Sequence, residues 1–277
     1  MKATAEDLTA IGALVEDLCG IVLDQTKGYL IENRFGELVG ELGCASYSEL
    51  ARRVRQGGEA DLKSKVIDAI TTNETLFFRD GSPFEAFKHK SLPETIDEKL
   101  SRGDKTLRIW SAACSTGQEP YTLAMILHDT LGKEIDDFNI RILATDISDE
   151  VIEKASRGVF TEYEVGRGLP AHQLSKYFHR EDGKYRVKDE LRYLVSFKRT
   201  NLLESLAHVG TQDIVFCRNV AIYFQRDARD SLYRRIQKQM SNGGYLFVGS
   251  GETLVDLGED FVPHSHCRSV FYRPNGV

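Results

Sequence analysis

Residues 106–120 read TLRIWSAACSTGQEP, and this stretch decides the fold class of the domain around it. The apolar run that begins at Leu107 has the length and composition of a buried strand. Small residues follow the run, and Pro120 is well placed in the first turn of a helix that we expect from Glu119. The next apolar run, NIRILATDI over 139–147, is again followed by a helical pattern, from Ser148. Strands that alternate with helices predict an α/β domain with a parallel, doubly wound sheet.

The alternation continues toward the C-terminus with one interruption. An amphipathic helical pattern surrounds Leu232 and Ile236. Further strands are predicted over 213–220, 244–250 and 269–274. Residues 158–200 break the rhythm, and the alternating stretch YRVKDELRYLVSFKR within them resembles strand sequence. We therefore expect a small β-subdomain inserted at 158–200.

The first ninety residues predict helices only. Apolar residues recur at spacings of three and four in the first helical pattern, which Gly20 should end. Three more helices are expected over 29–42, from a capping box at Ser46 and Glu49, and through 62–70. Ser82 and Pro83 form an N-cap and first-turn pair for the next helix. We expect an all-α N-terminal domain and linker over 1–90 and the α/β domain over 91–277.

Composition excludes several classes of protein. The chain has 277 residues, 41% of them hydrophobic, which suits a folded core and argues against disorder. A net charge of -6 disfavours a general nucleic-acid binder. No long uncharged apolar run and no signal-peptide pattern occur, so we expect a cytoplasmic protein without membrane insertion. Its five scattered cysteines should be reduced thiols.

Asp146 is the first candidate for a ligand-binding residue. It follows the second strand, where a carboxylate of a doubly wound sheet can accept hydrogen bonds from both ribose hydroxyls of a nucleoside cofactor. An acid at a strand end is often only a helix cap, but Ser148 is available for capping. The turn after the first strand contains Gly117 and lacks the G-x-G-x-x-G pattern, so a simple tight turn is the alternative for that motif.

Five motifs give the chain a specific resemblance over nearly its whole length. They are TTNETLFFRD (71–80), IWSAACSTGQEPYTLA (109–124), ATDIS (144–148), NLL (201–203) and FCRNVAIYF (216–224). The chain resembles the chemotaxis receptor methyltransferases. The resemblance implies a helical domain joined to a Rossmann-like class I methyltransferase domain with an inserted β-subdomain. It also implies S-adenosylmethionine as methyl donor, S-adenosylhomocysteine as product, and glutamates of chemoreceptor methylation helices as substrates. We further expect no metal and a monomer.

The same resemblance implies the residues of the site. Those implied for the cofactor are Asn73, Thr75, Arg79, Glu119, Asp146, Asn201, Leu202, Arg218 and Asn219. Tyr223 would lie close to the transferred methyl group, and Arg79 would also orient the incoming carboxylate. The chain departs from the family at Ala221, often a larger apolar residue, and at Gln118, often glutamate. From the residues alone, an ion pair with Asp80 or Glu85 is the alternative role for Arg79.

The chemistry suits such a site. A glutamate carboxylate with a reference pKa of about 4.3 is already ionised at neutral pH, so attack on a sulfonium methyl needs no general base. The protein must align the reacting atoms and exclude water. Two other functions stay open: a non-catalytic adaptor that binds S-adenosylmethionine, and, with less support, a nicotinamide-dependent dehydrogenase.

Two surfaces are candidates for partner binding. Arg52, Arg53 and Arg55 follow an acidic stretch and could meet an acidic receptor helix, unless they are only a solvated basic face. In the insertion, the turn at 181–183 is short, which predicts receptor methylation without a C-terminal tether peptide. An edge strand at 185–188 could still accept an extended peptide. His264 and His266 have ligand chemistry, but without further ligands they predict no metal site.

Overall fold

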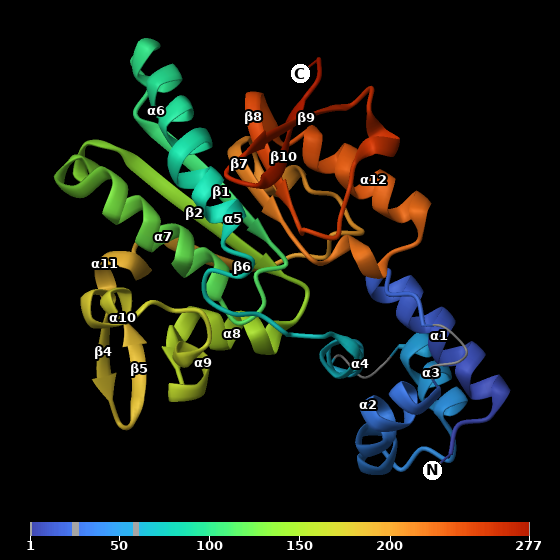
Figure 1. The fold of residues 1–277 in the computed structure, drawn as a ribbon. Coiled ribbons are helices and arrows are strands. Elements are labelled where there is room, and N and C mark those ends of the chain that lie inside the picture. The colour runs from blue at the N-terminus through green and yellow to red at the C-terminus, as the bar shows by residue number, and fades with distance from the viewer. Residues whose placement is uncertain (1, 24–27, 58–60, 277) are drawn as a thin grey trace.

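The computed structural model describes residues 2–23, 28–57 and 61–276. A helical domain at the N-terminus precedes an α/β domain with a small second sheet, as Figure 1 shows. The predicted fold class is therefore confirmed.

The N-terminal domain consists of helices α1 to α4. Their bounds are Ala5–Cys19, Gly28–Glu41, Tyr47–Gln56 and Leu62–Ile70. The Thr4 side chain caps α1 in a capping box with Asp7, and Gly20 ends the helix in the left-handed conformation, at φ 74°. The helices pack around Phe35 and Tyr47, which are fully buried.

The main sheet has the strand order β6-β2-β1-β7-β8-β10-β9. Its strands in chain order are β1 (Thr106–Ala112), β2 (Asn139–Asp146), β6 (Val195–Arg199), β7 (Gln212–Cys217), β8 (Met240–Val248), β9 (Phe261–His266) and β10 (Ser269–Pro274). Strands β6, β2, β1, β7 and β8 are parallel, whereas β10 runs antiparallel to β8 and to β9. The chain order reverses between β1 and β7, so a ligand crevice is expected at their carboxyl ends.

Helices cover both faces of this sheet because neighbouring residues of each buried strand point to opposite sides. Ile109 and Phe216 pack with the helices before and after β1, whereas Trp110 and Val215 pack with α12. The helices are α5 (Ser82–Ala86), α6 (Leu92–Ser101), α7 (Gln118–Leu131), α8 (Asp149–Arg157) and α12 (Arg226–Gln237). Short turns of helix are η2 (Phe87–Ser91), η3 (Gly132–Asp137), η4 (Ala207–Val209), η5 (Ala221–Tyr223) and η6 (Val255–Leu257).

The inserted subdomain is shorter than the predicted 158–200. It contains a sheet of order β3-β5-β4, with bounds Val159–Phe160, Lys184–Val187 and Phe178–Glu181. It also contains helices α9 (Glu162–Gly166), α10 (Ala171–Tyr177) and α11 (Asp189–Arg192). Residues 195–199 are not part of it, because they form β6 at the edge of the main sheet, paired with β2. None of the residues of this edge strand is fully buried, which explains why its alternating sequence was assigned to the inserted subdomain.

The hairpin of the subdomain has the short turn that the sequence predicts. Asp182 and Gly183 join β4 to β5 with φ values of 47° and 76°, the left-handed pair of a two-residue turn. The predicted edge strand at 185–188 is wrong, because β5 is the central strand and pairs with both β3 and β4.

The α/β core begins before residue 91. Phe77, Phe84 and Phe87 are buried in the same cluster as Ile109 of β1, so the linker enters the core well before the predicted boundary. Helix α5 begins at Ser82 with Gly81, not Ser82, at the N-cap position and with proline in the first turn, as expected.

Candidate active site

A pocket lies at the carboxyl ends of β1 and β7, where the chain order of the sheet reverses. Every residue that the sequence implied for the cofactor or for methyl transfer lines this pocket: Asn73, Thr75, Arg79, Glu119, Asp146, Asn201, Leu202, Arg218, Asn219 and Tyr223. Segments far apart in the sequence therefore converge on one cavity.

The loops that form the pocket contain residues with positive φ values. Ala113 and Ser115 after β1, and Asn219 after β7, have positive φ values of 56°, 49° and 59°. Such values are uncommon for residues other than glycine, and they cluster at functional sites. Gly117 has a φ of 97°, and a side chain there would meet the Ala155 Cβ at 3.0 Å. Glycine at 117 is thus required by the turn itself, and the small side chains of Ala113 and Ser115 leave room for a ligand.

Asp146 presents a buried carboxylate to the pocket. Its two oxygens accept hydrogen bonds from the backbone amides of Ser115 at 2.9 Å and Ser148 at 3.1 Å. Burial raises the pKa of Asp146, and these amide hydrogen bonds oppose that shift. The Ser148 side chain caps α8 by accepting from the Val151 amide, as expected. Because an ionised carboxylate offers about four acceptor positions, Asp146 retains acceptor capacity for hydroxyl groups.

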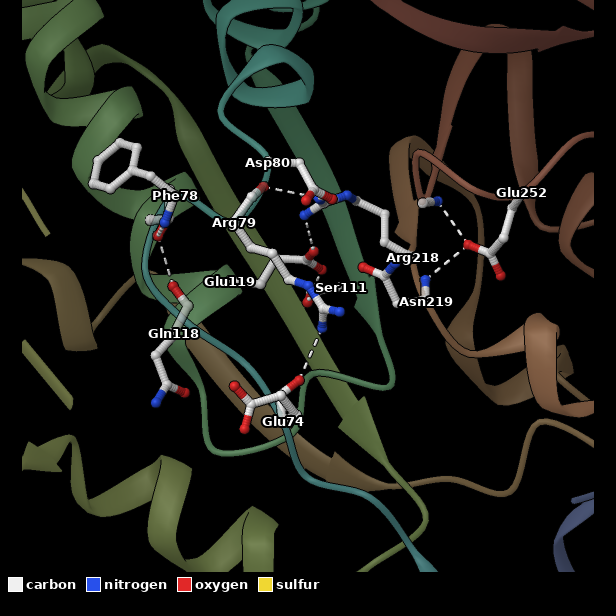
Figure 2. A network of polar contacts seen from close by, with 12 residues as sticks. Glu74, Phe78, Arg79, Asp80, Ser111, Gln118, Glu119, Arg218, Asn219 and Glu252 are labelled. Atoms are coloured by element: carbon white, nitrogen blue, oxygen red, sulfur yellow. Dashed lines mark hydrogen bonds and ion pairs between the residues drawn. The ribbon is translucent and has the colours of Figure 1, made fainter. Parts of the chain in front are cut away.

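Arg218 ties the linker to the sheet through a buried network, drawn in Figure 2. Its guanidinium contacts the Glu119 carboxylate at 3.0 Å and the Asp80 carboxylate at 2.7 Å, and it donates to the Arg79 carbonyl at 2.8 Å. Glu119 also accepts from the Ser111 hydroxyl at 2.8 Å. The side chain of Arg218 is only 2% exposed. Arg218 therefore offsets one of the two negative charges of Glu119 and Asp80 within the protein.

Arg79 has a different environment. Its guanidinium donates to the Glu74 carbonyl at 2.8 Å. Within residues 2–23, 28–57 and 61–276 it forms no ion pair, because Asp80 pairs with Arg218 and Glu85 pairs with His89 at 3.3 Å. The ion-pair alternative from the sequence is thus not what the structure shows. Arg79 contributes a positive charge to the pocket that a negatively charged ligand group could balance.

The N-terminal domain completes the pocket, which the sequence did not predict. Its contributions are Cys19, Ile21, Val22, Leu23, Leu30, Arg34 and Ile70. The Asn201 side chain donates to the Leu18 carbonyl at 2.9 Å, and the Val22 amide donates to the Tyr223 carbonyl at 3.0 Å. The sequence contained one indication of this contact. The apolar residues 21–23 continue beyond the end of the helix at Gly20, and they need another surface of the protein to be buried.

The lining has the chemistry that S-adenosylmethionine requires. Asp146 would accept hydrogen bonds from the ribose hydroxyls. Leu202 and Ile147 line the pocket with apolar side chains against which an adenine ring could pack. These residues belong to the α/β domain, so the N-terminal domain would close the cavity from the other side.

The fold and the pocket together define a class. Numbered along the chain within the main sheet, the strands have the order 3-2-1-4-5-7-6, with a pocket at the 1/4 switch point and a buried carboxylate after strand 2. This is a Rossmann-like methyltransferase. Residues 6–71 match the family described as CheR methyltransferase, all-alpha domain, and residues 73–269 match CheR methyltransferase, SAM binding domain. The chain belongs to the CheR methyltransferase family.

Relatives support this assignment over the full length. The chain is 39% identical over 276 residues to Chemotaxis protein methyltransferase 1 of Pseudomonas aeruginosa, covering 99% of each. It is 38% identical over 258 residues to Chemotaxis protein methyltransferase Cher2 of Pseudomonas putida, covering 92% of this chain and 93% of that one. Among solved structures, N-methyltransferase NodS from Bradyrhizobium japonicum with S-adenosyl-L-homocysteine matches at TM-score 0.38 and 14% identity, covering 71% and 90%. The resemblance drawn from the motifs is confirmed, and the chain is a methyltransferase of chemotaxis that uses S-adenosylmethionine.

Two further observations concern the described residues. None of the helices over 2–23, 28–57 and 61–276 is long and apolar enough to span a bilayer. In the same ranges, no three His, Cys, Asp or Glu side chains lie where they could hold a metal ion together.

The predicted partner-binding arginines do not share one face. Arg52 and Arg55 are exposed, with 64% and 49% of their side chains accessible, and they form surface ion pairs with Glu49 and Asp17. Arg53 instead turns toward the domain and donates to the Leu42 carbonyl at 2.8 Å. Any docking role therefore falls to Arg52 and Arg55.

Asp146→Asn is expected to weaken S-adenosylmethionine binding by about 1.5–3 kcal/mol, or tenfold and more in Kd, because a hydroxyl loses a charged acceptor. Asparagine keeps an acceptor oxygen for only one of the two loop amides, so the melting temperature of the variant is measured to confirm that it folds. Isothermal titration measures the effect, and Asp149→Asn, which changes an exposed acid three residues later, is the matched control. An unchanged Kd would remove Asp146 from the site.

Proposed function

We propose that this chain transfers the methyl group of S-adenosylmethionine to glutamate side chains of chemoreceptor methylation helices and forms glutamate methyl esters. The observation that carries the proposal is Arg79, a pocket cation with no carboxylate within ion-pair distance among the described residues. Its charge helps to lower the pKa of Glu74, whose carboxylate pairs with Arg167. A glutamate carboxylate is the substrate that such a cation would attract and orient. Because those receptor segments are cytoplasmic, we place the enzyme in the cytoplasm.

The residues of the pocket have separate tasks in this reaction. S-adenosylmethionine supplies an electrophilic methyl group, and the ionised carboxylate needs no base to attack it. Arg79 would hold the carboxylate in line, and Tyr223, 40% exposed at the cavity wall, would contact the donor side. Apolar Ile21, Val22 and Leu23 from the N-terminal domain would exclude water that otherwise solvates the nucleophile.

The proposal is tested with purified protein, tritiated S-adenosylmethionine and isolated receptor signalling domains. We expect incorporation of label that base treatment releases as methanol, since methyl esters are base-labile. Label that resists base would contradict ester formation. Binding of the methyl donor without transfer to any receptor domain would instead favour the non-catalytic adaptor.

The exposed arginines of α3 give a prediction about the partner. Changing both Arg52 and Arg55 to glutamate is expected to raise the KM for receptor domains about fivefold or more at low salt, because an acidic helix surface would be repelled. The Kd for S-adenosylmethionine should not change. Lys133→Glu, an exposed charge reversal in η3, is the control for a general charge effect. If the double variant and the control have the same KM as the wild type, these arginines are only a solvated face.

A further inference from the structure

Glu252 connects the loops that follow β7 and β8, and sequence motifs gave it no role. One oxygen of its carboxylate accepts hydrogen bonds from the Asn219 amide at 2.7 Å and from the Gly249 amide at 2.6 Å. Figure 2 shows the carboxylate pointing at the loop that contains Asn219, on the side away from Arg79. Glu252 itself does not line the pocket, whereas Asn219 does.

The loop after β7 needs such support because its backbone is in an unfavourable region. Asn219 has a φ of 59°, which costs free energy for a residue other than glycine and persists only when neighbouring contacts fix it. The chain turns away from the sheet here, so the amide of Asn219 has no ladder partner. Glu252 supplies a charged acceptor for that amide.

Gly249 allows the contact between Glu252 and Asn219 because it has no side chain. A Cβ atom at this position would lie 2.6 Å from the Asn219 side-chain nitrogen and 2.6 Å from the Glu252 oxygen. The loop after β8 therefore offers Asn219 both an acceptor for its main chain and space for its side chain. Glu252 and Gly249, both in the loop after β8, thus support Asn219 in the loop after β7.

The consequence reaches the pocket through the short helix η5. Val220 follows Asn219 as the N-cap residue of η5, and the Tyr223 amide donates to the Val220 carbonyl at 3.2 Å. Val220 and Tyr223 both line the pocket. The backbone conformation of Asn219 therefore determines the positions of Val220 and Tyr223 in the pocket wall.

We infer that Glu252 is a positioning residue for the methyl-donor pocket, acting through the backbone of Asn219. The inference deepens the proposed function and rests on it only for the methyl-transfer step, because its effect on binding of the donor is independent of the receptor. Removing the carboxylate leaves the Asn219 amide without its acceptor, and the left-handed turn loses the contact that holds it.

The test measures the Kd for S-adenosylmethionine by isothermal titration with the full chain, well below the melting transition of each variant. Glu252→Ala should raise the Kd at least fivefold, and Glu252→Gln, which keeps an acceptor oxygen, should restore it to within twofold of the wild type. Should Glu252→Ala not fold, Glu252→Asp carries the same test, because its shorter side chain ends one methylene away from the Asn219 amide.

The control must separate positioning from loss of stability. Asp213 lies at the opposite end of β7, and its buried carboxylate accepts from the Arg108 amide at 2.8 Å and pairs with Lys99 at 2.9 Å. Asp213→Ala should lower Tm without changing the Kd. A Kd within fivefold of wild type for Glu252→Ala, an equal weakening in Asp213→Ala, or no recovery with Glu252→Gln would each overturn the inference.

The same variants separate this inference from the proposed function. The wild type must methylate receptor domains, and Glu252→Ala should lower kcat at least fivefold with the KM for the receptor within twofold. A wild type that binds S-adenosylmethionine but methylates no receptor contradicts the proposed function alone. A methylating wild type and an equally active Glu252→Ala contradict the positioning role alone.

Discussion

Replacing Arg218 with methionine is expected to lower the free energy of unfolding by about 3–5 kcal/mol. The guanidinium contacts two carboxylates and one carbonyl in a place that water barely reaches. Methionine fills much of the same space but leaves Glu119 and Asp80 without their counter-charge. Breaking a buried pair on one side is costly because the remaining charge stays desolvated.

Thermal and urea unfolding of the variant measure this effect. The control is Arg226→Met, because Arg226 also contacts two carboxylates, Asp230 and Asp256, but is 69% exposed. Its loss should cost less than about 1 kcal/mol, as for other surface ion pairs. Equal stabilities of the two variants would mean that the Arg218 network contributes little, and its role would then lie in ligand contact alone.

The contrast between these arginines shows what the sequence could and could not predict about the site. The motif FCRNV placed Arg218 and Asn219 at a strand end, and strand ends of a doubly wound sheet meet at one edge. The position of the site was therefore predictable. Arg218 forms ion pairs with Asp80 and Glu119, whereas Arg79 forms none among the described residues. These ion pairs join segments that are far apart in the sequence, so the spacing of the motifs does not predict them.

The fold was predictable where burial gives a clear periodicity. Strand β7 is buried along its whole length, and β1 and β2 are buried toward their carboxyl ends, so the apolar residues there indicated their positions in the sequence. Strand β6 was missed as a member of the main sheet because it lies at the edge and alternates in burial. Edge strands of a sheet and strands of a separate hairpin have the same pattern.

Contacts between domains were the least predictable part. The residues of α1, α2 and the segment after Gly20 that line the pocket come from a domain whose docking depends on surface complementarity. Glu252 was missed for the same reason, since it acts on a residue 33 positions away in the sequence. Arg53 was wrongly grouped with its neighbours because one side chain of a short helix reached back to the Leu42 carbonyl.

Arg79→Ala is expected to lower kcat/KM for receptor methylation by about 10²–10³, equivalent to about 2.7–4 kcal/mol, because a preorganised charge at the reacting group is lost. The fold should be unaffected, within about 0.5 kcal/mol, since the guanidinium has a single hydrogen bond to the Glu74 carbonyl. Initial rates of methyl transfer and thermal melting measure the two effects separately.

Two further variants make this prediction specific. Arg79→Lys keeps the charge but not the planar pair of donors, so it should recover only part of the activity. Arg102→Ala removes an arginine that is 67% exposed and pairs with Glu98 far from the pocket, and it should leave the rate unchanged. If Arg79→Ala lowered Tm strongly while the folded enzyme kept its rate, Arg79 would be a structural residue. Its charge would then have no part in methyl transfer, and the main support for a carboxylate substrate would be lost.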